Sequence, residues 1–346
     1  MNLLSKIKFI LKRPKVIIVT GKGRASAKEA IFQVLKLHFK IGKDILIFES
    51  DLREEIRQFE WLIKNSSLPV LVVSQVGEIP FDKDFFAGER EDTLEIRKLT
   101  KALPVFGYLI LNFDDETVRE IKDETNLKEI TFGFQEGADF RATDIKLNKG
   151  TNFKLNYKGS IVPVWLEKLF GKEQIYSALA SAAVGTIFDL NLVEISQALK
   201  NYKGLPGKMR LIEGIKNTLI LDDSESATLF SMIEAIEILG KIEAKRKIAV
   251  LGDVIGIGKY TIEAHQAIGE HVSKNADLLF TFGQRAKFIA QGAQERGMTI
   301  ERIFQFDKID QGKLKLQDEI KEGDLILIDG SKEMEMRKIV EEIKAF

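Results

Sequence analysis

The residues best suited to chemistry lie in one segment near the start of the chain, VIIVTGKGRASAKE at 16–29. A buried strand, a glycine turn and a helix follow one another there, which is the layout of a phosphate-binding P-loop. In such a loop backbone N–H groups surround the phosphates, a Lys contacts the terminal phosphates and a hydroxyl binds Mg²⁺. The segment therefore predicts a nucleotide site, although a strand-to-helix turn that binds no nucleotide explains the pattern equally well.

Several groups of this segment depart from the working spacing G-x-x-x-x-G-K-[ST]. Gly21 and Gly23 are too close together, Arg24 stands in the place of the Lys, and Ala25 offers no oxygen to a metal. Ser26 is the nearest hydroxyl, but one residue along a helix turns a side chain by roughly 100°. We predict a phosphate site at Gly21, Gly23, Arg24 and Ser26, with Ser26 as a metal ligand only after a local shift.

Carboxylates follow several predicted strands, and in open α/β sheets ligands bind at the carboxyl ends of strands. These residues are Glu49 with Asp51, Asp222 with Asp223, and Asp253. Such carboxylates hold Mg²⁺ or a ribose, or they cap the helix that follows. For the last three residues the pattern leaves ligand contact and capping at even odds.

The histidines and Ser224 offer no second type of site. His38, His265 and His271 have no metal-ligand spacing and are expected on the surface or in the core. Ser224 has no His or Lys partner for a nucleophilic triad, so covalent catalysis has little support.

Short apolar runs alternate with amphipathic helical stretches, which is typical of βαβ units and a mainly parallel sheet. The predicted strands of the first half are 16–20, 45–49, 69–74 and 108–112, with an antiparallel patch at 130–134, 140–147, 152–155 and 161–166 and helices at 26–39, 52–64, 172–188 and 192–201. After a Gly- and Pro-rich turn at 203–208, a second series of strands is predicted at 218–222, 247–252, 278–282, 302–306 and 324–329.

The expected fold is therefore α/β with two domains. Residues 1–205 form a central P-loop-type domain with a mainly parallel sheet and a small antiparallel patch, and residues 206–346 form a Rossmann-like C-terminal domain.

Composition narrows the partners and the compartment. Basic and acidic residues number 52 each, so nothing in the overall charge favours nucleic acid or an acidic membrane surface as the main partner, and we expect no nucleic-acid partner. The absence of cysteine excludes disulfides and thiolate chemistry and fits the cytoplasm, where we expect the protein. No apolar run approaches the roughly 20 residues needed to span a bilayer. The basic amphipathic stretch at 1–15 is expected to dock on the protein's own core, and the alternative is attraction to an anionic membrane surface.

Three motifs in the second half of the chain occur together and in a characteristic order. LILDDSESATLFSM at 219–232, IAVLGDVIGIGKYTIEAHQAIGEHV at 248–272 and GDLILIDGSKEMEMRKIV at 323–340 resemble the DDSYNANPxSM, LGDMxELG and KGSRxxxME motifs of the Mur ligases of peptidoglycan synthesis. In the first half, VIIVTGKGRASAKEAI, ILIFES, VVSQVGE and LPVFGYLILNFDD more loosely resemble that family's VTGSxGKTSTKE, VLEMGA, ITNVG and LPxxGxxVLNxDD. The resemblance extends from about residue 16 to 340 and is strongest to the family's D-alanyl-D-alanine-adding branch.

The resemblance implies a chemistry and its residues. Mur ligases activate a carboxylate with ATP to an acyl phosphate, which an amine then attacks, so ATP and Mg²⁺ are implied if this protein is active and no cofactor if it is not. Glu49 matches the family's metal-binding Glu, and Lys208 matches an Arg at the domain junction; both are implied as catalytic positions. Ser177, Asp222, Asp223 and Asp253 are implied in nucleotide binding.

Other positions implied by the resemblance have lost the family's residue. Arg24 and Ala25 replace the Lys and the Thr of the loop, a His falls near Pro80, Glu173 replaces a His of the helix motif, and Asp329 replaces a Lys. We also expect the family's N-terminal UDP-sugar domain to be missing, because the loop strand begins at Val16.

Three hypotheses follow. In the first, the protein is an active, divergent ligase that uses Arg24 for phosphate and Glu49 for Mg²⁺. In the second, which we favour because the lost groups act as a unit, it is a catalytically inactive scaffold that binds a nucleotide, a cell-wall precursor or a cell-wall enzyme. In the third, it is a divergent folate-type ligase, which fits the motifs less well.

Overall fold

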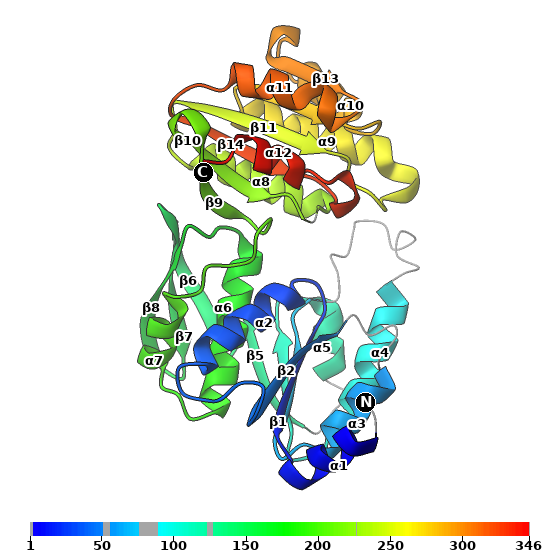
Figure 1. Cartoon of the computed structure of the whole chain (residues 1–346), viewed down its shortest axis with the longest axis vertical. Coiled ribbons are helices and arrows are strands. Elements are labelled where there is room, and N and C mark those ends of the chain that lie inside the picture. Colours follow the sequence, from blue (N-terminus) through cyan, green and yellow to red (C-terminus); the bar gives the residue numbers. More distant parts are fainter. Residues whose placement is uncertain (1–2, 51–55, 76–88, 123–126, 226, 346) are drawn as a thin grey trace. The chain divides into compact units, whose positions relative to one another are not determined.

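The computed structural model of the protein describes residues 3–50, 56–75, 89–122, 127–225 and 227–345. Two compact units share the chain. The first comprises Met1–Lys146, Thr151–Glu167 and Lys172–Lys203, and the second comprises Leu147–Gly150, Lys168–Gly171 and Gly204–Phe346. Each unit is built on one β-sheet with helices packed against it, which confirms the predicted α/β class (Figure 1).

An eight-stranded sheet is formed by the described residues of the first unit, in the order β2-β1-β3-β4-β5-β6-β7-β8. Its strands are β1 (Lys15–Thr20), β2 (Ile45–Ser50), β3 (Pro69–Val73), β4 (Tyr108–Asn112), β5 (Lys128–Gly133), β6 (Phe140–Leu147), β7 (Gly150–Tyr157) and β8 (Ser160–Glu167). The pairs β1–β2, β1–β3, β3–β4 and β4–β5 are parallel. Two-residue connections join β6 to β7 and β7 to β8, and connections this short join antiparallel strands.

One detail of the predicted antiparallel patch was wrong. Residues 130–134 fall mostly in β5, which pairs in parallel with β4 and so belongs to the parallel part of the sheet. The reason is that a helix covers this strand: Phe132 is fully buried and packs edge-on against Tyr176. The antiparallel part begins only with the β6–β7 hairpin.

Helices pack on both the parallel and the antiparallel parts of this sheet. They are α1 (Leu3–Lys12), α2 (Arg24–Leu35), α3 (Ile56–Asn65), α4 (Glu89–Ala102), α5 (Glu116–Lys122), α6 (Lys172–Ile187) and α7 (Leu192–Leu199), the last of which lies against β8. Alternate strand residues such as Val16 and Ile18 point to one face, where they pack with apolar residues of α3, α4 and α5. The intervening residues point to the other face, where α2 and α6 lie against each other (Figure 1).

Among the described side chains of α1, Phe9 is the one that is buried against this unit. Phe9 is buried, and its ring lies 5.1 Å from that of Trp61 in α3, whereas Leu4, Ile7, Ile10 and Leu11 are exposed. The expectation that this stretch docks on the core is therefore met by Phe9, and Lys6 lies over the Trp61 ring at 5.5 Å beside it. Within the described chain, every helix is too short or too polar to cross a bilayer.

The second unit has a six-stranded sheet in the order β13-β12-β11-β14-β10-β9. Its elements are β9 (Arg210–Gly214), β10 (Thr218–Asp223), α8 (Leu229–Lys241), β11 (Arg246–Gly252), α9 (Thr261–Asn275), β12 (Leu278–Phe282), α10 (Lys287–Glu295), β13 (Ile303–Phe306), α11 (Ile309–Glu319), β14 (Asp324–Asp329) and α12 (Arg337–Ile343). Five strands are parallel, and the edge strand β9, which the sequence did not predict, pairs antiparallel with β10.

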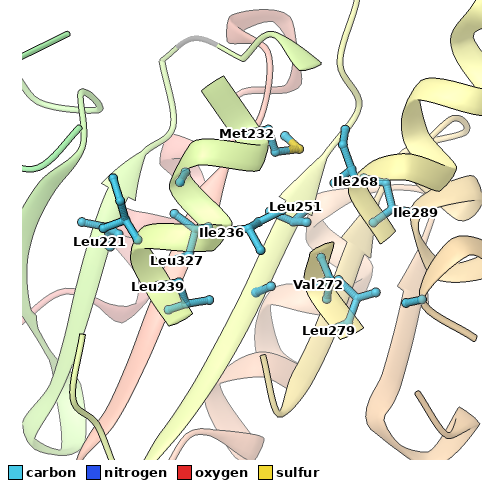
Figure 2. Packing of buried hydrophobic residues seen from close by; sticks show 14 of the residues in the cluster. Leu221, Met232, Ile236, Leu239, Leu251, Ile268, Val272, Leu279, Ile289 and Leu327 are labelled. Carbon is cyan, nitrogen blue, oxygen red and sulfur yellow. The ribbon is translucent and has the colours of Figure 1, made fainter. Parts of the chain in front are cut away.

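Both faces of this sheet are buried, which explains why its strands read as continuous apolar runs. Leu221, Leu251 and Leu327 point to the face covered by α8, α9 and α10 (Figure 2). Their neighbours Ile220 and Ile328 point to the opposite face, where α11 and α12 pack. The period of two along each strand assigns every residue to one of these cores.

Candidate functional site

The glycine turn at the end of β1 is held closely against the end of β3. Gly21 has a φ of 91°, and a Cβ placed on it would lie 2.2 Å from the carbonyl oxygen of Gln75. The Lys22 N–H donates to that same oxygen at 2.7 Å, and the Ser74 hydroxyl donates to the Lys22 carbonyl. The turn therefore needs glycine at position 21 for close backbone approach as well as for a positive φ.

Replacing Gly21 by alanine is expected to destabilise the first unit by about 3 kcal/mol, because a left-handed backbone costs roughly 1 kcal/mol for a side-chain residue and the clash with Gln75 adds overpacking. Gly42→Ala is the matched control. Its φ is 85° and a Cβ there meets nothing within 4 Å, so we expect a loss of only about 1 kcal/mol. Urea unfolding measures both variants, and equal losses would rule out the close approach.

A carboxylate from α6 occupies the start of the loop helix. Helix α2 begins at Arg24, and the Ser26 hydroxyl, which is fully buried, donates to Glu173 Oε1 at 2.6 Å. The Glu173 side chain also lies over the turn, since a Cβ on Gly23 would be 3.1 Å from its Cγ. The N-terminus of a helix attracts anions through its free N–H groups and its dipole. In this protein the Glu173 carboxylate already lies at the N-terminus of α2.

Tyr202 makes a second contact to helix α2. The hydroxyl of Tyr202 donates to Gln174 Oε1 at 2.7 Å and lies 3.3 Å from the Ser26 carbonyl oxygen. Burial raises the pKa of the Tyr202 phenol far above its ordinary value, with the Glu173 carboxylate as the next cause, so the phenol stays neutral. Ser177 is also engaged, because its hydroxyl donates to the Glu173 carbonyl at 2.8 Å within α6.

The donor set predicted for Mg²⁺ does not fit the ion in this arrangement. Glu49 lies at the carboxyl end of β2, but its carboxylate is 3.3 Å from the Lys28 ammonium. Ser26 faces Glu173, and Ala25 has no oxygen. Among the described residues no group of three or more His, Asp or Glu side chains is arranged to hold a metal ion. The metal-binding and catalytic roles of Glu49 therefore stay predictions, as does the metal role of Ser26.

Arg24 is the loop's half-buried cation, and within the described residues it has no ion-pair partner. A guanidinium offers five donors in a fork that suits phosphate oxygens. Its role in phosphate binding stays a prediction, as do those of Gly21 and Gly23. Asp51 and Pro80, which the sequence also singled out, lie outside the described residues.

In the second unit, Asp222 and Asp223 tie the Gly- and Pro-rich turn to β10. Asp222 accepts the Gly207 N–H at 2.9 Å and the Ser224 hydroxyl at 2.6 Å. Asp223 accepts the Met209 N–H at 3.2 Å. Both carboxylates are buried, but neither caps the helix that follows, because the N-cap of α8 is Thr228. Their role in nucleotide binding stays a prediction.

Asp329 is the least satisfied polar residue of the second unit. It lies beside Asp223 in the register of β10 and β14 and is fully buried. Burial raises the pKa of its carboxyl well above the ordinary value, and the Asp223 carboxylate raises it further, while the Gly330 N–H and the half-buried Lys208 oppose the shift. Neither oxygen makes a hydrogen bond of good geometry within the described chain. The catalytic role of Lys208 stays a prediction.

Asp253 holds the loops at the end of β11 together. Its Oδ1 accepts the N–H groups of Arg285 and Ala286 at 2.9 and 2.7 Å, and its carbonyl accepts the Ser331 N–H at 3.2 Å. Nearby, His265 is fully buried and accepts the Val254 N–H at 3.1 Å through Nε2. Its Nδ1 lies 2.6 Å from the Thr261 carbonyl, and burial lowers the pKa of its imidazole, so the ring is neutral. His265 is thus a core residue, one of the two placements expected.

The contact that the sequence did not predict is the one between Glu173 and Ser26. Glu173 stood out only as a replaced motif residue, because 147 positions separate it from Ser26. The pairing of Lys28 with Glu49 was missed for a similar reason. One signal was available in the sequence. At position 173 a Glu replaces the family's His, at the start of the helix predicted at 172–188.

The geometry defines a two-domain α/β protein with a P-loop-like turn in its first sheet and a second, mainly parallel sheet. The model of the Mur ligase middle domain matches residues 84–185, and that of the Mur ligase, glutamate ligase domain matches residues 207–332. The chain belongs to the Mur ligase family. Neither matched range includes the loop at 16–29.

Individual relatives give the same assignment. The chain is 23% identical over 356 residues to the UDP-N-acetylmuramoyl-tripeptide–D-alanyl-D-alanine ligase of Bacillus subtilis strain 168, covering 95% of this chain and 76% of that ligase. With the ligase of the same name from Escherichia coli K12 it shares 29% identity over 198 residues, which is 56% of this chain and 43% of that ligase.

Solved structures share the fold. MurF from Acinetobacter baumannii superposes with a TM-score of 0.81 at 20% identity, over 97% of this chain and 78% of that one. The MurF ligase from Thermotoga maritima in complex with ADP gives a TM-score of 0.78 at 20% identity, over 98% of this chain and 81% of that one. Identities this low establish the common fold alone.

Proposed function

We propose that this protein is a Mur ligase relative of peptidoglycan precursor synthesis in which ATP-dependent amide ligation is reduced or lost. It acts by binding a nucleotide, a cell-wall precursor or a cell-wall enzyme. In this proposal residues 1–205 correspond to the family's middle, ATPase-like domain and residues 206–346 to its C-terminal domain. The names of the relatives support the pathway.

The observation that carries the proposal is the hydrogen bond from the Ser26 hydroxyl to Glu173. Phosphoryl transfer depends on positioning phosphates and neutralising their charge, by backbone N–H groups, a cation and a metal. Here a carboxylate lies at the N-terminus of the loop helix and takes the nearest hydroxyl. A triphosphate bound in this loop would lie beside the negative Glu173 carboxylate, at the position where hydrogen-bond donors are needed.

The departures at the metal position support the same conclusion. Ala25 supplies no ligand, and Glu49 is paired with Lys28. Groups that act together in catalysis lose most of their effect when any one is removed, so several losses in one site are consistent with little or no turnover. In this proposal, binding of a cell-wall precursor or a cell-wall enzyme does not require the metal ligands at positions 25 and 49.

An active, divergent D-alanyl-D-alanine-adding ligase is the second candidate, and the observation that favours it is Arg24. Its guanidinium has no ion-pair partner among the described residues and starts the loop helix. Arginine binds phosphate in bidentate fashion. In this candidate Arg24 holds the phosphates and turnover requires Glu173 to move away.

Calorimetric titration of the purified chain with Mg·ATP, combined with a phosphate-release assay in the presence of D-alanyl-D-alanine and other amino-acid acceptors, separates the two candidates. We expect weak or undetectable binding at millimolar ATP and no turnover above that of a heat-denatured control. Binding without turnover also supports the proposal and makes the protein a nucleotide-binding scaffold. Micromolar binding with acceptor-dependent phosphate release would overturn it.

A further inference from the structure

Helix α1 presents its apolar side away from the domain that carries it. Phe9 is 6% exposed and packs on Trp61, whereas Leu4 and Leu11 are 71% and 79% exposed. At 100° per residue, Leu4, Ile7 and Leu11 share one stripe, and Phe9 lies roughly 160° from Leu11 on the opposite side. The helix is therefore anchored by its back and exposes its apolar stripe.

Cations flank this stripe on both sides. On the same helical wheel, Lys8 lies roughly 40° beyond Leu4, and Lys6 lies roughly 40° beyond Ile10 on the other edge. Lys6 is positioned over the Trp61 ring at 5.5 Å, and Lys8 and Lys12 have no ion-pair partner within the described chain. An apolar stripe with Lys8 at one edge and Lys6 at the other is an arrangement in which aliphatic stems follow the apolar surface and charged heads reach a polar layer.

The same edge of the first unit carries more apolar and cationic surface. Helix α1 precedes β1, and the segments 36–44 and 103–107 precede β2 and β4, which run parallel to β1. All three segments thus lie at the amino ends of the strands, at the edge opposite the glycine turn. The exposed apolar residues in the two connecting segments are Leu37, Val105 and Phe106.

We propose that α1 and this edge of the sheet bind the surface of an anionic lipid bilayer. The charge at this edge suits that partner: residues 1–15, which lead into β1 at its amino end, contain five Lys and Arg residues and no Asp or Glu, although the whole chain is neutral. Each basic residue near an anionic surface adds to the attraction, and exposed leucine and isoleucine insert among the headgroups.

The helix lies in the plane of the interface. Ten residues of α-helix extend about 15 Å, half of the roughly 30 Å hydrocarbon thickness. A bilayer suits this surface better than a protein does, because the stripe is exposed and is bordered by cations on both sides. The inference rests on α1 and on the exposed apolar residues at the amino ends of the strands, and it is independent of the proposed function.

Vesicle flotation of the full chain tests the proposal. We expect at least tenfold more protein to float with vesicles of phosphatidylglycerol and phosphatidylcholine than with pure phosphatidylcholine, and this binding to fall in about 0.5 M NaCl, which screens the attraction. The variants Ile7→Ser with Leu11→Ser, and Lys8→Glu with Lys12→Glu, should each reduce binding at least tenfold. Their side chains are exposed, so folding is retained.

The matched control is Ile300→Ser with Leu314→Ser, which removes two exposed apolar residues from the second unit and should leave flotation unchanged. Equal binding to both kinds of vesicle, undiminished binding of the α1 variants, or no flotation at all would overturn the proposal. Light scattering that shows a dimer of the native chain, lost in the Ile7 and Leu11 variant, without vesicle binding would assign the stripe to a second copy.

Discussion

Replacing Glu173 by glutamine is expected to raise the affinity of the protein for Mg·ATP at least tenfold. Glutamine keeps the shape of the side chain and still accepts the Ser26 hydroxyl, so the substitution removes only the charge. Two unit charges about 4 Å apart interact by about 4 kcal/mol at an effective dielectric constant of 20. A tenfold change needs about 1.4 kcal/mol, which is a fraction of that repulsion.

The measurement is calorimetric titration of the native chain, Glu173→Gln and the control Glu29→Gln with Mg·ATP. Glu29 lies on α2, the helix that carries Ser26, and is half-buried, but its carboxylate accepts from Gln33 and is one turn away from the glycine turn. We expect little change for the control. No gain for Glu173→Gln, or an equal gain for the control, would show that the Glu173 charge does not limit binding.

Adding Arg24→Lys and Ala25→Thr to Glu173→Gln should increase the affinity further, because these changes restore the family's phosphate and hydroxyl groups. If only the triple variant binds, the charge and the missing groups act together. If the triple variant also fails to bind, the close spacing of Gly21 and Gly23 is the limiting feature.

The second large effect concerns the two ends of β14, where the same substitution should have opposite consequences. Asp329→Asn is expected to stabilise the second unit by about 2 kcal/mol at pH 8, because it removes a buried, unsatisfied carboxylate beside Asp223. Asp324→Asn should destabilise it by about 3 kcal/mol, since it removes the charge of a buried carboxylate that pairs in bidentate fashion with the half-buried Arg246 at 3.0 and 2.6 Å.

The effect of Asp329 depends on pH in a definite direction. Because the pKa of its carboxyl is raised in the folded state, the folded protein binds the proton more tightly than the unfolded chain. The stability that this group contributes is fully present below the unfolded pKa of about 3.9 and is lost as the pH rises through the folded pKa. The advantage of Asp329→Asn should therefore be small near pH 4 and grow toward pH 8.

Urea unfolding of the full chain at several pH values measures both variants. The two substitutions should shift one unfolding transition in opposite directions, and that transition is assigned to the second unit. A pH-independent difference between the native chain and Asp329→Asn would mean that Asp329 does not titrate over that range. A loss of stability in Asp329→Asn would mean that the carboxylate has a partner that the amide cannot replace.

The fold was largely predictable because both sheets are covered by helices. Buried parallel strands give apolar runs bounded by turns, and the runs at 278–282 and 324–329 coincide with β12 and β14. Edge strands carry a weaker signal. Strand β9 follows directly on the Gly- and Pro-rich turn and has one exposed face, so its pattern was not distinguishable from a connection.

By itself, the sequence determined the α/β class, the positions of the glycine turn and the acidic strand ends, and the family resemblance, because these depend on local order along the chain. Only the tertiary structure decided what the candidate groups contact. Glu173 contacts Ser26, and Asp329 lies beside Asp223, because the fold brings distant segments together. Leu11 is exposed because α1 packs through its opposite side. Whether the loop at 16–29 can accept phosphate depends on the charge that α6 places beside it. The spacing of residues along the chain does not determine that contact.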